Sequence, residues 1–268
     1  MPVDERSPRA LSIAGSDSGG GAGIQADLKT FSALGCYGMT AVTAVTVQNT
    51  EGVTGYEELS PRLVADQIRA VASDIGVDAA KTGMLASAAV VEAVAEAVAD
   101  QGIDRLVVDP VFVSKHGHRL LATEAVASLR TKLLPLAVVV TPNLPEAAGL
   151  ADMDAVESRD DMERAAAGIL ELGPRSVLVK GGHLEGSESS DLLASATGDR
   201  EWLVGERIDS PNTHGTGCVL SAAIAARLAH GDPLDVAVRA GKAFVTEAIR
   251  HSLAIGKGIG PVNPLFQG

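Results

Sequence analysis

Short runs of branched apolar residues alternate along this chain with longer alanine-rich segments of helical periodicity. This alternation is typical of βαβ units, in which helices connect parallel strands and cover both faces of the sheet. The expected strands are Ala10–Ala14, Thr40–Val47, Ala79–Thr82, Arg105–Asp109, Ala137–Thr141 and Ser176–Lys180. The expected helices are Gly23–Leu34, Pro61–Ile75, Ala86–Asp100, Thr123–Leu133, Ser158–Leu172, Gly217–His230 and Pro233–His251. The pattern predicts an α/β fold with a mostly parallel central sheet.

Composition supports this fold class. Apolar residues make up 46% of the chain but aromatic residues only 3%, so Ala, Val, Leu and Ile must fill the core, as in parallel sheets buried under helices. The stretches Asp191–Ala194 and Glu201–Arg207 predict a hairpin at a sheet edge. No biased linker or repeat divides residues 1–268, so we expect one domain, with residues 1–9 flexible. Leu265–Gly268 resemble a protease recognition sequence used in cloning and are left out of this expectation.

The net charge and the lack of membrane-span or signal-peptide patterns disfavour several classes of partner and location. The chain has 22 basic and 34 acidic residues, a net charge of −12, which disfavours nucleic-acid and anionic membrane surfaces. No apolar stretch approaches the ~20 residues of a membrane span, and the first ten residues lack a signal-peptide core. The two cysteines, Cys36 and Cys218, are too few for a disulfide framework. We expect a cytoplasmic protein that acts on a small molecule.

A glycine-rich loop follows the first expected strand, from Gly15 to Gly23. Gly21-x-Gly23-x-x-Ala26 satisfies a relaxed dinucleotide fingerprint, but seven residues separate it from the strand, where that turn should be tight. The second strand ends near Gln48 rather than at a ribose-binding acid. A backbone cradle for a small polar substrate is therefore the preferred interpretation, and a dinucleotide oxidoreductase the weaker one.

The segment from His214 to Cys218, His-Gly-Thr-Gly-Cys, stands directly before an alanine-rich helix. Backbone N–H groups of Gly215, Thr216 and Gly217 can converge on an anion at a helix N-terminus, an arrangement suited to a phosphoryl group in transfer. Cys218 lies on the first turn, where the helix dipole is expected to favour its thiolate. Taken alone, the segment is equally compatible with a simple helix start and a small buried thiol.

Candidate metal and phosphate ligands follow three further strands. Asp109 ends the fourth strand, Asn143 and Glu146 follow the fifth around the start of a short helix, and Lys180 ends the sixth. Oxygen ligands of this kind suit Mg²⁺ held mainly by water and nucleotide phosphates. Each has an ordinary structural alternative: Glu146 a helix-start acid, Asp109 a cap before a proline, Lys180 a surface lysine. Their shared position at the carboxyl edge of the sheet, where α/β proteins bind ligands, favours a common site.

Taken together, six segments resemble the hydroxymethylpyrimidine/phosphomethylpyrimidine kinases of thiamine biosynthesis, in the ribokinase-like superfamily. The segments are residues 14–30, 48–50, 81–84, 141–147, 180–183 and 212–218, and the resemblance extends from about Leu11 to Pro261. It implies a three-layer α/β/α fold, ATP with Mg²⁺, and a homodimer. It also implies the reaction: two successive phosphoryl transfers from ATP, to the hydroxymethyl group of 4-amino-5-hydroxymethyl-2-methylpyrimidine and then to the monophosphate.

The resemblance implies roles for individual residues. Gly215, Thr216 and Gly217 form an anion hole, with Cys218 the proposed catalytic base; many sugar kinases of the superfamily have an aspartate there. Gln48 recognises the pyrimidine amino group and ring nitrogen, and Gly15, Asp27, Met84 and Val111 line the same pocket. Asp109, Asn143, Lys180 and His214 are assigned to ATP, and Glu146 and Asp109 to the metal. The chain departs from the family pattern at His116-Gly-His118 and at Gly258-Ile-Gly260.

Two other functions stay open. Pyridoxine also carries a hydroxymethyl group on an aromatic nitrogen ring, so a pyridoxine/pyridoxal kinase is the alternative enzyme. A pyrimidine-binding regulatory module without turnover is the alternative from another class, and the presence of Asp109, Glu146, Lys180 and Cys218 argues against it.

Overall fold

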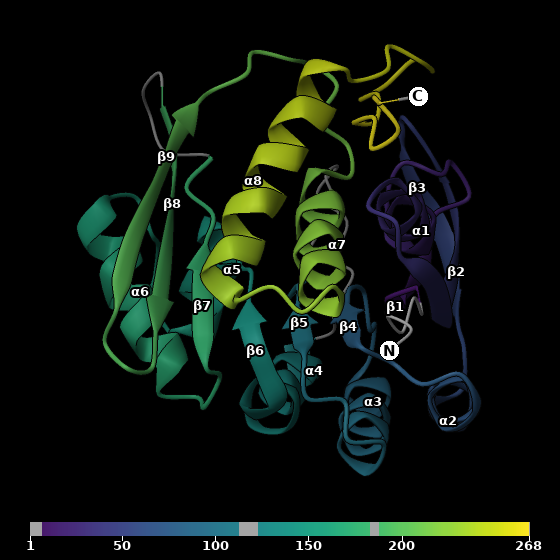
Figure 1. The fold of residues 1–268 in the computed structure, drawn as a ribbon. Helices are drawn as coiled ribbons and strands as arrows, with labels where there is room; N and C mark the ends of the chain where they lie inside the picture. The colour runs from purple at the N-terminus through teal and green to yellow at the C-terminus, as the bar shows by residue number, and fades with distance from the viewer. Residues whose placement is uncertain (1–6, 113–122, 183–187, 268) are drawn as a thin grey trace, which may run out of the picture.

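The computed structural model describes residues 7–112, 123–182 and 188–267. In this part of the chain nine strands form one sheet in the order β3-β2-β1-β4-β5-β6-β7-β8-β9 (Figure 1). Their bounds are β1 Arg9–Ser16, β2 Tyr37–Asn49, β3 Gly52–Glu58, β4 Ala79–Thr82, β5 Leu106–Val108, β6 Ala137–Val140, β7 Ser176–Val179, β8 Glu188–Ser195 and β9 Arg200–Glu206. Strands β2, β1, β4, β5, β6 and β7 are mutually parallel, as the alternating pattern predicts.

The two edges of the sheet are antiparallel. The predicted hairpin is confirmed as β8 and β9, which close the edge beside β7. Strand β3 at the opposite edge was not predicted from the sequence. It contains two glycines, Gly52 and Gly55, and ends in Glu57 and Glu58, so its composition does not favour a strand. It is held by its antiparallel pairing with the long strand β2.

The helices agree with the predicted segments to within a few residues. They are α1 Gly23–Ala33, α2 Pro61–Asp74, α3 Ala88–Asp100, α4 Thr123–Ser128, α5 Leu144–Leu150, α6 Arg159–Leu170, α7 Thr216–Ala229 and α8 Leu234–Arg250. Local signals set several of these bounds, since the Ser60, Ser87 and Ser158 side chains accept hydrogen bonds from the first turns of α2, α3 and α6. The predicted helix 123–133 instead ends at Ser128 and continues as a π-helical turn, Leu129–Leu133, and a 3₁₀ turn that contains Pro135.

The helices form two layers with the sheet between them. Helices α2, α3, α4, α5 and α6 bury one apolar core against the sheet, and α1, α7 and α8 bury the other. Helices α7 and α8 lie side by side across their face of the sheet (Figure 1). The predicted α/β fold with a mostly parallel sheet is confirmed.

Two features of the chain ends bear on the expectations. Arg9, expected in a flexible end, begins β1, and its guanidinium forms an ion pair with Asp78 at 2.6 Å. Phe266 packs against Phe244 of α8 with ring centroids 5.2 Å apart. Over the described ranges, no helix combines the length and apolar character needed to span a bilayer.

Candidate active site

The parallel strands bring the predicted site residues to one edge of the sheet, because their carboxyl ends all point the same way. The glycine-rich loop follows β1 and Gln48 lies near the end of β2. Asp109 follows β5, the Asn143–Glu146 segment follows β6, and Lys180 follows β7. The N-terminus of α7 reaches this edge from the helical layer. We call the groups at β1–β2 the acceptor side and those at β5–β7 the phosphate side, after the roles expected from the sequence.

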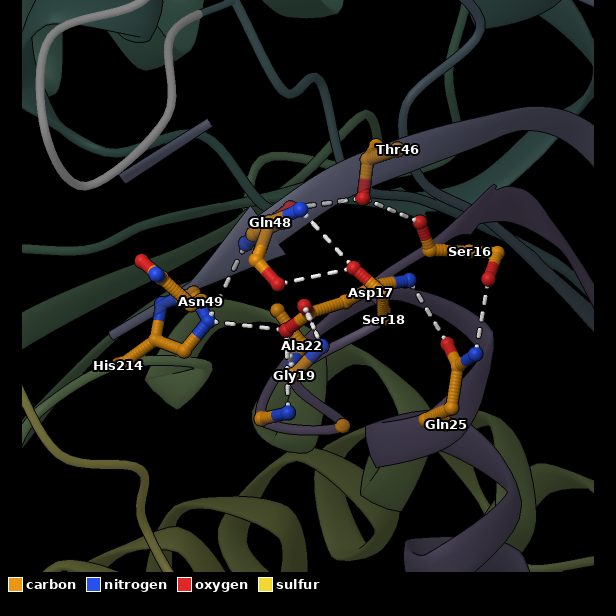
Figure 2. Close-up of polar contacts among 12 residues, drawn as sticks. Ser16, Asp17, Ser18, Gly19, Ala22, Gln25, Thr46, Gln48, Asn49 and His214 are labelled. Atoms are coloured by element: carbon orange, nitrogen blue, oxygen red, sulfur yellow. Dashed lines mark hydrogen bonds and ion pairs between the residues drawn. The ribbon is translucent and has the colours of Figure 1, made fainter. Parts of the chain in front are cut away.

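The glycine-rich loop is wound around the Asp17 side chain (Figure 2). The Asp17 carboxylate accepts hydrogen bonds from the backbone N–H groups of Gly19, Gly21 and Ala22 at 2.8–3.0 Å. A Cβ on Gly21 would lie 2.6 Å from His214 Cδ2 and 2.9 Å from Pro261 Cβ. The glycine spacing that matched a dinucleotide fingerprint therefore serves the packing of the loop against the protein itself, and that interpretation is wrong.

His214 connects this loop to the end of β2. Its Nε2 lies 3.0 Å from Asp17 Oδ2 and 3.3 Å from Gln48 Nε2 (Figure 2). Burial alone would raise the pKa of Asp17, but the hydrogen bonds from His214 and Gly19 outweigh it and hold that pKa below its usual value. His214, assigned to ATP in the sequence analysis, thus lies with its ring among groups of the acceptor side.

Helix α7 begins at Gly215, whose φ of +82° lies in the left-handed region. A Cβ on Gly215 would overlap the Gly21 carbonyl oxygen, so only glycine fits between the loop and the helix. Within the part of the chain described, no side chain caps this N-terminus. The Thr216 N–H makes a long hydrogen bond of 3.4 Å to the Thr213 carbonyl. A Cβ on Gly217 would lie 3.5 Å from Lys180 Nζ and 3.7 Å from Asp109 Oδ2, so the first turn of α7 faces the charged groups of the phosphate side.

Cys218 lies on the first turn of α7 and is partly buried. Burial raises the pKa of the Cys218 thiol to about 11, and the nearby Lys81 cation opposes this shift. The expectation that the thiolate is favoured at this position is therefore wrong, because the cost of desolvation exceeds the opposing effect of Lys81.

A buried ion pair lies beneath this turn. Lys81 Nζ is 3.0 and 2.9 Å from the two carboxylate oxygens of Asp27, and the Ser12 hydroxyl donates to Asp27 Oδ2 at 2.5 Å. Lys81 and Asp27 are both inaccessible to solvent. Burial raises the pKa of Asp27, while Lys81 and Ser12 act in the opposite direction. Asp27, expected in the substrate pocket, uses its oxygens for these two partners.

Gly15 and Met84 come together as expected for one pocket wall. A Cβ on Gly15 would lie 3.3 Å from the Met84 sulfur. Met84 is held by its carbonyl, which accepts a hydrogen bond from the Thr43 hydroxyl at 2.6 Å, and it packs in a small apolar cluster with Ala44 and Ala86. Val111, the other expected pocket residue, follows β5, and its N–H donates to the Asp109 carbonyl at 2.9 Å.

On the phosphate side, Asp109 is the centre of a polar cluster. Its Oδ1 lies 3.3 Å from Lys180 Nζ and 3.3 Å from the Thr141 hydroxyl, and its Oδ2 accepts from the Ser221 hydroxyl of α7 at 3.1 Å. Lys180 is only 17% exposed, so it is a largely buried, ion-paired lysine and not the surface lysine of the structural alternative. Asp109 holds Lys180 and α7 in a fixed relation.

Asn143 and Glu146 form a reciprocal cap at the start of α5. The Asn143 side chain accepts from the Glu146 N–H at 2.9 Å, and Glu146 Oε2 accepts from the Asn143 N–H at 2.8 Å. Burial, and the negative charge of Asp109, raise the pKa of Glu146 to about 7, although Lys180 lowers it. The helix-start role of Glu146 is therefore present, and its carboxyl is also poised to change charge near neutral pH.

The donor set fits Mg²⁺ held mainly by phosphates and water. Among residues 7–112, 123–182 and 188–267, no group of three or more His, Cys, Asp or Glu side chains could hold a metal ion. Mg²⁺ in phosphoryl-transfer enzymes commonly uses only one or two carboxylates, and the mutual repulsion of Asp109 and Glu146 is relieved by a cation. His116, His118 and His183 lie outside the described residues.

Several polar residues of the site were not assigned a role from the sequence, among them Lys81, Ser221 and Thr46. Lys81 is the one charged residue of the fully buried β4 segment, and a lone lysine in a buried strand is a signal that could have identified it. Ser221 lies three residues after Cys218 and therefore on the same helix face, toward Asp109. Thr46, whose hydroxyl lies 3.2 Å from Gln48, had no comparable signal, because threonine is common in strands.

Comparisons with known proteins identify the family of this chain. A profile of the family described as "Phosphomethylpyrimidine kinase" matches residues 17–263. The hydroxymethylpyrimidine/phosphomethylpyrimidine kinase of Streptomyces coelicolor is 54% identical over 257 residues, which cover 96% of this chain and 94% of that protein.

Solved structures of two kinds are similar to the fold. An ADP complex of Bacillus subtilis pyridoxal kinase has a TM-score of 0.90 at 40% identity and covers 96% of this chain and 97% of that one. A phosphomethylpyrimidine kinase from Clostridium difficile 630 has a TM-score of 0.79 at 45% identity and covers 90% of this chain and 99% of that one.

Proposed function

Because the chain belongs to the phosphomethylpyrimidine kinase family, we propose that it is the bifunctional kinase of thiamine biosynthesis. It transfers the γ-phosphoryl group of ATP first to the hydroxymethyl group of 4-amino-5-hydroxymethyl-2-methylpyrimidine and then to the resulting monophosphate. The observation that supports this most directly is the uncapped N-terminus of α7, with Gly217 facing Lys180 and Asp109 on one side and Cys218 near the buried Lys81 on the other.

The acceptor alcohol occupies the side of the site formed by the ends of β1, β2 and β4. Gln48 offers an amide, which both accepts and donates hydrogen bonds, as the pyrimidine amino group and its neighbouring ring nitrogen require. Gly15 and Met84, which approach each other closely, supply one wall of this pocket, and Val111 follows β5 beside it. Asp27, which is buried against Lys81 and Ser12, supports the pocket from beneath and does not line it. This pocket suits a flat heteroaromatic ring.

The triphosphate occupies the phosphate side. The N–H groups of Gly215, Thr216 and Gly217 surround the transferred group, and Lys180 neutralises the charge that moves with it. Asp109 keeps Lys180 in place through their 3.3 Å ion pair. Asn143 contributes by fixing the start of α5, and so the position of the Glu146 carboxylate.

Glu146 and Asp109 hold Mg²⁺ together with the phosphate oxygens. The bound metal supplies charge neutralisation and orientation of the phosphates. Glu146 would hold the cation as a carboxylate, and with a pKa of about 7 it is partly ionised at neutral pH.

Cys218 accepts the hydroxyl proton in the first transfer. With a pKa of about 11, its thiolate is a strong but rarely populated base, and Lys81 is the positive charge that stabilises it. The second acceptor is already an ionised phosphate, so that transfer needs little help from a base. The two steps therefore depend on Cys218 to different degrees.

One coupled assay tests the proposed function. ADP release is measured with the pyrimidine alcohol, with its monophosphate and with pyridoxal, each at equal ATP and Mg²⁺. We expect turnover with the first two. Turnover with pyridoxal alone would contradict the proposal, and ligand binding without ADP release would favour a regulatory module.

The second candidate is pyridoxal kinase activity, favoured by the 0.90 TM-score of the Bacillus subtilis pyridoxal kinase. The thiol at Cys218, where many sugar kinases of the superfamily have a carboxylate, agrees with the pyrimidine branch. The same assay compares the two activities directly, as the ratio of kcat/KM values.

We also propose that the enzyme is a cytoplasmic homodimer. Val45 and Val47 of β2, near one edge of the sheet, are 49% and 64% exposed and lie two residues apart on one face of the strand, so they offer an apolar surface to a second copy of the chain. Light scattering at two concentrations tests the assembly, and a monomer at both would overturn it.

A further inference from the structure

The amide of Gln48 lies between two hydrogen-bonding side chains that come from different parts of the chain (Figure 2). Gln48 Nε2 is 3.3 Å from Nε2 of His214, and Gln48 Oε1 is 3.2 Å from the hydroxyl oxygen of Thr46. An amide exchanges its oxygen and nitrogen by a half-turn of the terminal group. Whether a neighbouring side chain donates or accepts a hydrogen bond therefore determines whether the oxygen or the nitrogen of the amide faces it.

His214 must be the hydrogen-bond donor in its contact with Gln48. Asp17 Oδ2 lies 3.0 Å from His214 Nε2 and already accepts from the N–H groups of Gly21 and Ala22, so Asp17 is an ionised acceptor. Its pKa below the usual value agrees with this state. The proton between the two residues therefore belongs to His214 Nε2, and an N–H at that position can be shared only with an acceptor on Gln48.

The Thr46 hydroxyl must be the hydrogen-bond acceptor in its contact with Gln48. The Thr46 hydroxyl has a single proton, and the Ser16 carbonyl lies 2.7 Å away, closer than the Gln48 amide at 3.2 Å. A hydroxyl that donates to Ser16 can only accept from Gln48. Both neighbours thus favour the same orientation, with Gln48 Oε1 toward His214 and Gln48 Nε2 toward Thr46.

We propose that His214 and Thr46 are positioning residues that lock the Gln48 amide in this orientation and so determine which heteroaromatic ring the kinase accepts. The proposal rests on the proposed function, in which Gln48 contacts the acceptor ring. After these two contacts the amide keeps one lone pair and one N–H. Their order is fixed, so the ligand edge that fits has a donor and an acceptor side by side in one order only.

This order separates two classes of acceptor. An aminopyrimidine offers an amino donor beside a ring-nitrogen acceptor, which pairs with both remaining groups of Gln48. Pyridoxal offers a phenolic oxygen at that edge, which makes a different demand on the same amide. A polar group left unpaired in a buried site is costly, so a locked amide discriminates more strongly than one that is free to turn.

The first test is the proton on His214, measured without turnover. Two-dimensional ¹⁵N spectra of the histidine rings, assigned with His214→Gln, report which ring nitrogen carries a proton. We expect a protonated Nε2. An unprotonated Nε2 would overturn the proposal, whatever the enzyme's substrate proves to be.

The second test is kinetic and uses Thr46→Val, which keeps the shape of the side chain and removes its hydroxyl, and with it both the contact to Gln48 and the hydrogen bond to the Ser16 carbonyl. We expect KM for the pyrimidine alcohol to rise about tenfold, with kcat and KM for ATP nearly unchanged, because the Gln48 amide loses one of its two fixed partners. The preference over pyridoxal should fall in the same proportion. Thr46→Ser restores the acceptor and should restore KM. Thr54→Val on the adjacent strand, where the hydroxyl donates to the Val47 carbonyl at 3.2 Å and not to Gln48, is the matched control.

Coupling to Gln48 distinguishes positioning from general damage. If Thr46 acts through Gln48, then Thr46→Val should change KM little in a Gln48→Leu background. Full additivity of the two substitutions would contradict the proposal even if the wild-type enzyme phosphorylates the pyrimidine. No turnover of the pyrimidine by the wild-type enzyme would instead refute the proposed function, and with it this specificity role.

Discussion

Burial is the main cause of the shifted pKa values of two ionisable residues of the site, Cys218 and Glu146. The Cys218 thiol and the Glu146 carboxyl both have pKa values raised by desolvation, to about 11 and about 7. Each group therefore favours its neutral form. The proposed transfer requires the ionised forms, a Cys218 thiolate to accept the hydroxyl proton and a Glu146 carboxylate to bind Mg²⁺.

For Cys218, we expect Cys218→Ala to lower kcat of the first transfer by ~10²–10⁴-fold, the usual contribution of a general base, and to affect the second transfer less. Since the pKa is about 11, the thiolate fraction rises with pH across the range 7 to 9, so kcat of the first transfer in the wild type should rise as well.

Steady-state rates with the alcohol and with the monophosphate, each between pH 7 and 9, check this expectation. Cys36→Ala is the control, because Cys36 is also buried with a pKa of about 11 but lies in the apolar core. Near wild-type turnover in Cys218→Ala would reduce Cys218 to a packing residue.

For Glu146, we expect the Mg²⁺ concentration for half-maximal activity to rise as the pH falls below about 7, because the carboxyl becomes protonated and neutral there. Glu146→Gln should need more Mg²⁺ at every pH and should lose this pH dependence, while KM for the alcohol stays nearly constant. Asp161→Asn is a matched control, since Asp161 caps α6 in the same way at a position outside the site. Superimposable Mg²⁺ titrations for wild type and Glu146→Gln would show that the metal is held elsewhere.

Among the helices and strands, the start of α7 is the element on which both halves of the site depend. It contacts the glycine-rich loop at Gly215 and the phosphate side at Gly217. Its other end has an equivalent glycine in the left-handed region, Gly231, with φ of +91° and no atom within 4 Å of a Cβ placed there. Substitution of Gly231 therefore tests the cost of backbone strain alone, whereas substitution of Gly215 tests strain together with steric overlap.

We expect Gly231→Ala to destabilise the fold by ~1–2 kcal/mol, the cost of a left-handed backbone for a residue with a Cβ, and to leave activity unchanged. Gly215→Ala should cost more and should abolish most activity, because its Cβ also overlaps the Gly21 carbonyl and displaces the loop from the helix. Denaturant unfolding and kcat of both variants check this. Equal losses of stability and activity in the two variants would mean that the contact with Gly21 has no importance.

At the scale of the whole molecule, the buried Lys81–Asp27 pair connects the central strand β4 to α1 beneath the site. We expect Lys81→Met to destabilise the fold by about 3–5 kcal/mol, because it leaves an uncompensated carboxylate in the core. The loss should shrink as the pH falls, since burial already raises the pKa of Asp27 and a protonated Asp27 needs no partner.

Thermal and denaturant unfolding at pH 5 and pH 8 measure this effect. The double variant Lys81→Met/Asp27→Asn removes both charges and keeps an acceptor for Ser12, so it should be more stable than Lys81→Met alone. A double variant whose loss equals the sum of the two single losses would contradict the view that the pair acts as a unit.

The order of strands and helices could be predicted from the sequence because apolar periodicity and capping residues act locally. The edge strand β3 could not, because two glycines and two glutamates in seven residues do not favour a strand, and only its hairpin pairing with the preceding strand β2 holds it in the sheet. The site positions followed from the same logic, since residues after parallel strands meet at one edge. Their charge states did not follow, because the burial of Cys218 and the Lys81–Asp27 contact exist only after the helical layer is packed.

The pairing of His214 with Pro261 has a consequence for the order in which the enzyme is made. The His214 N–H donates to the Gly260 carbonyl and the Val262 N–H to the His214 carbonyl, while Ile259 donates to the Thr50 carbonyl beside β2. Residues 259–262 follow all nine described strands along the chain, so they are synthesised after the sheet, and they join walls of the site that were made earlier. The sheet can therefore form during translation before these residues are made, whereas a competent acceptor pocket must wait for them. A nascent chain of this protein carries its fold before it carries its activity.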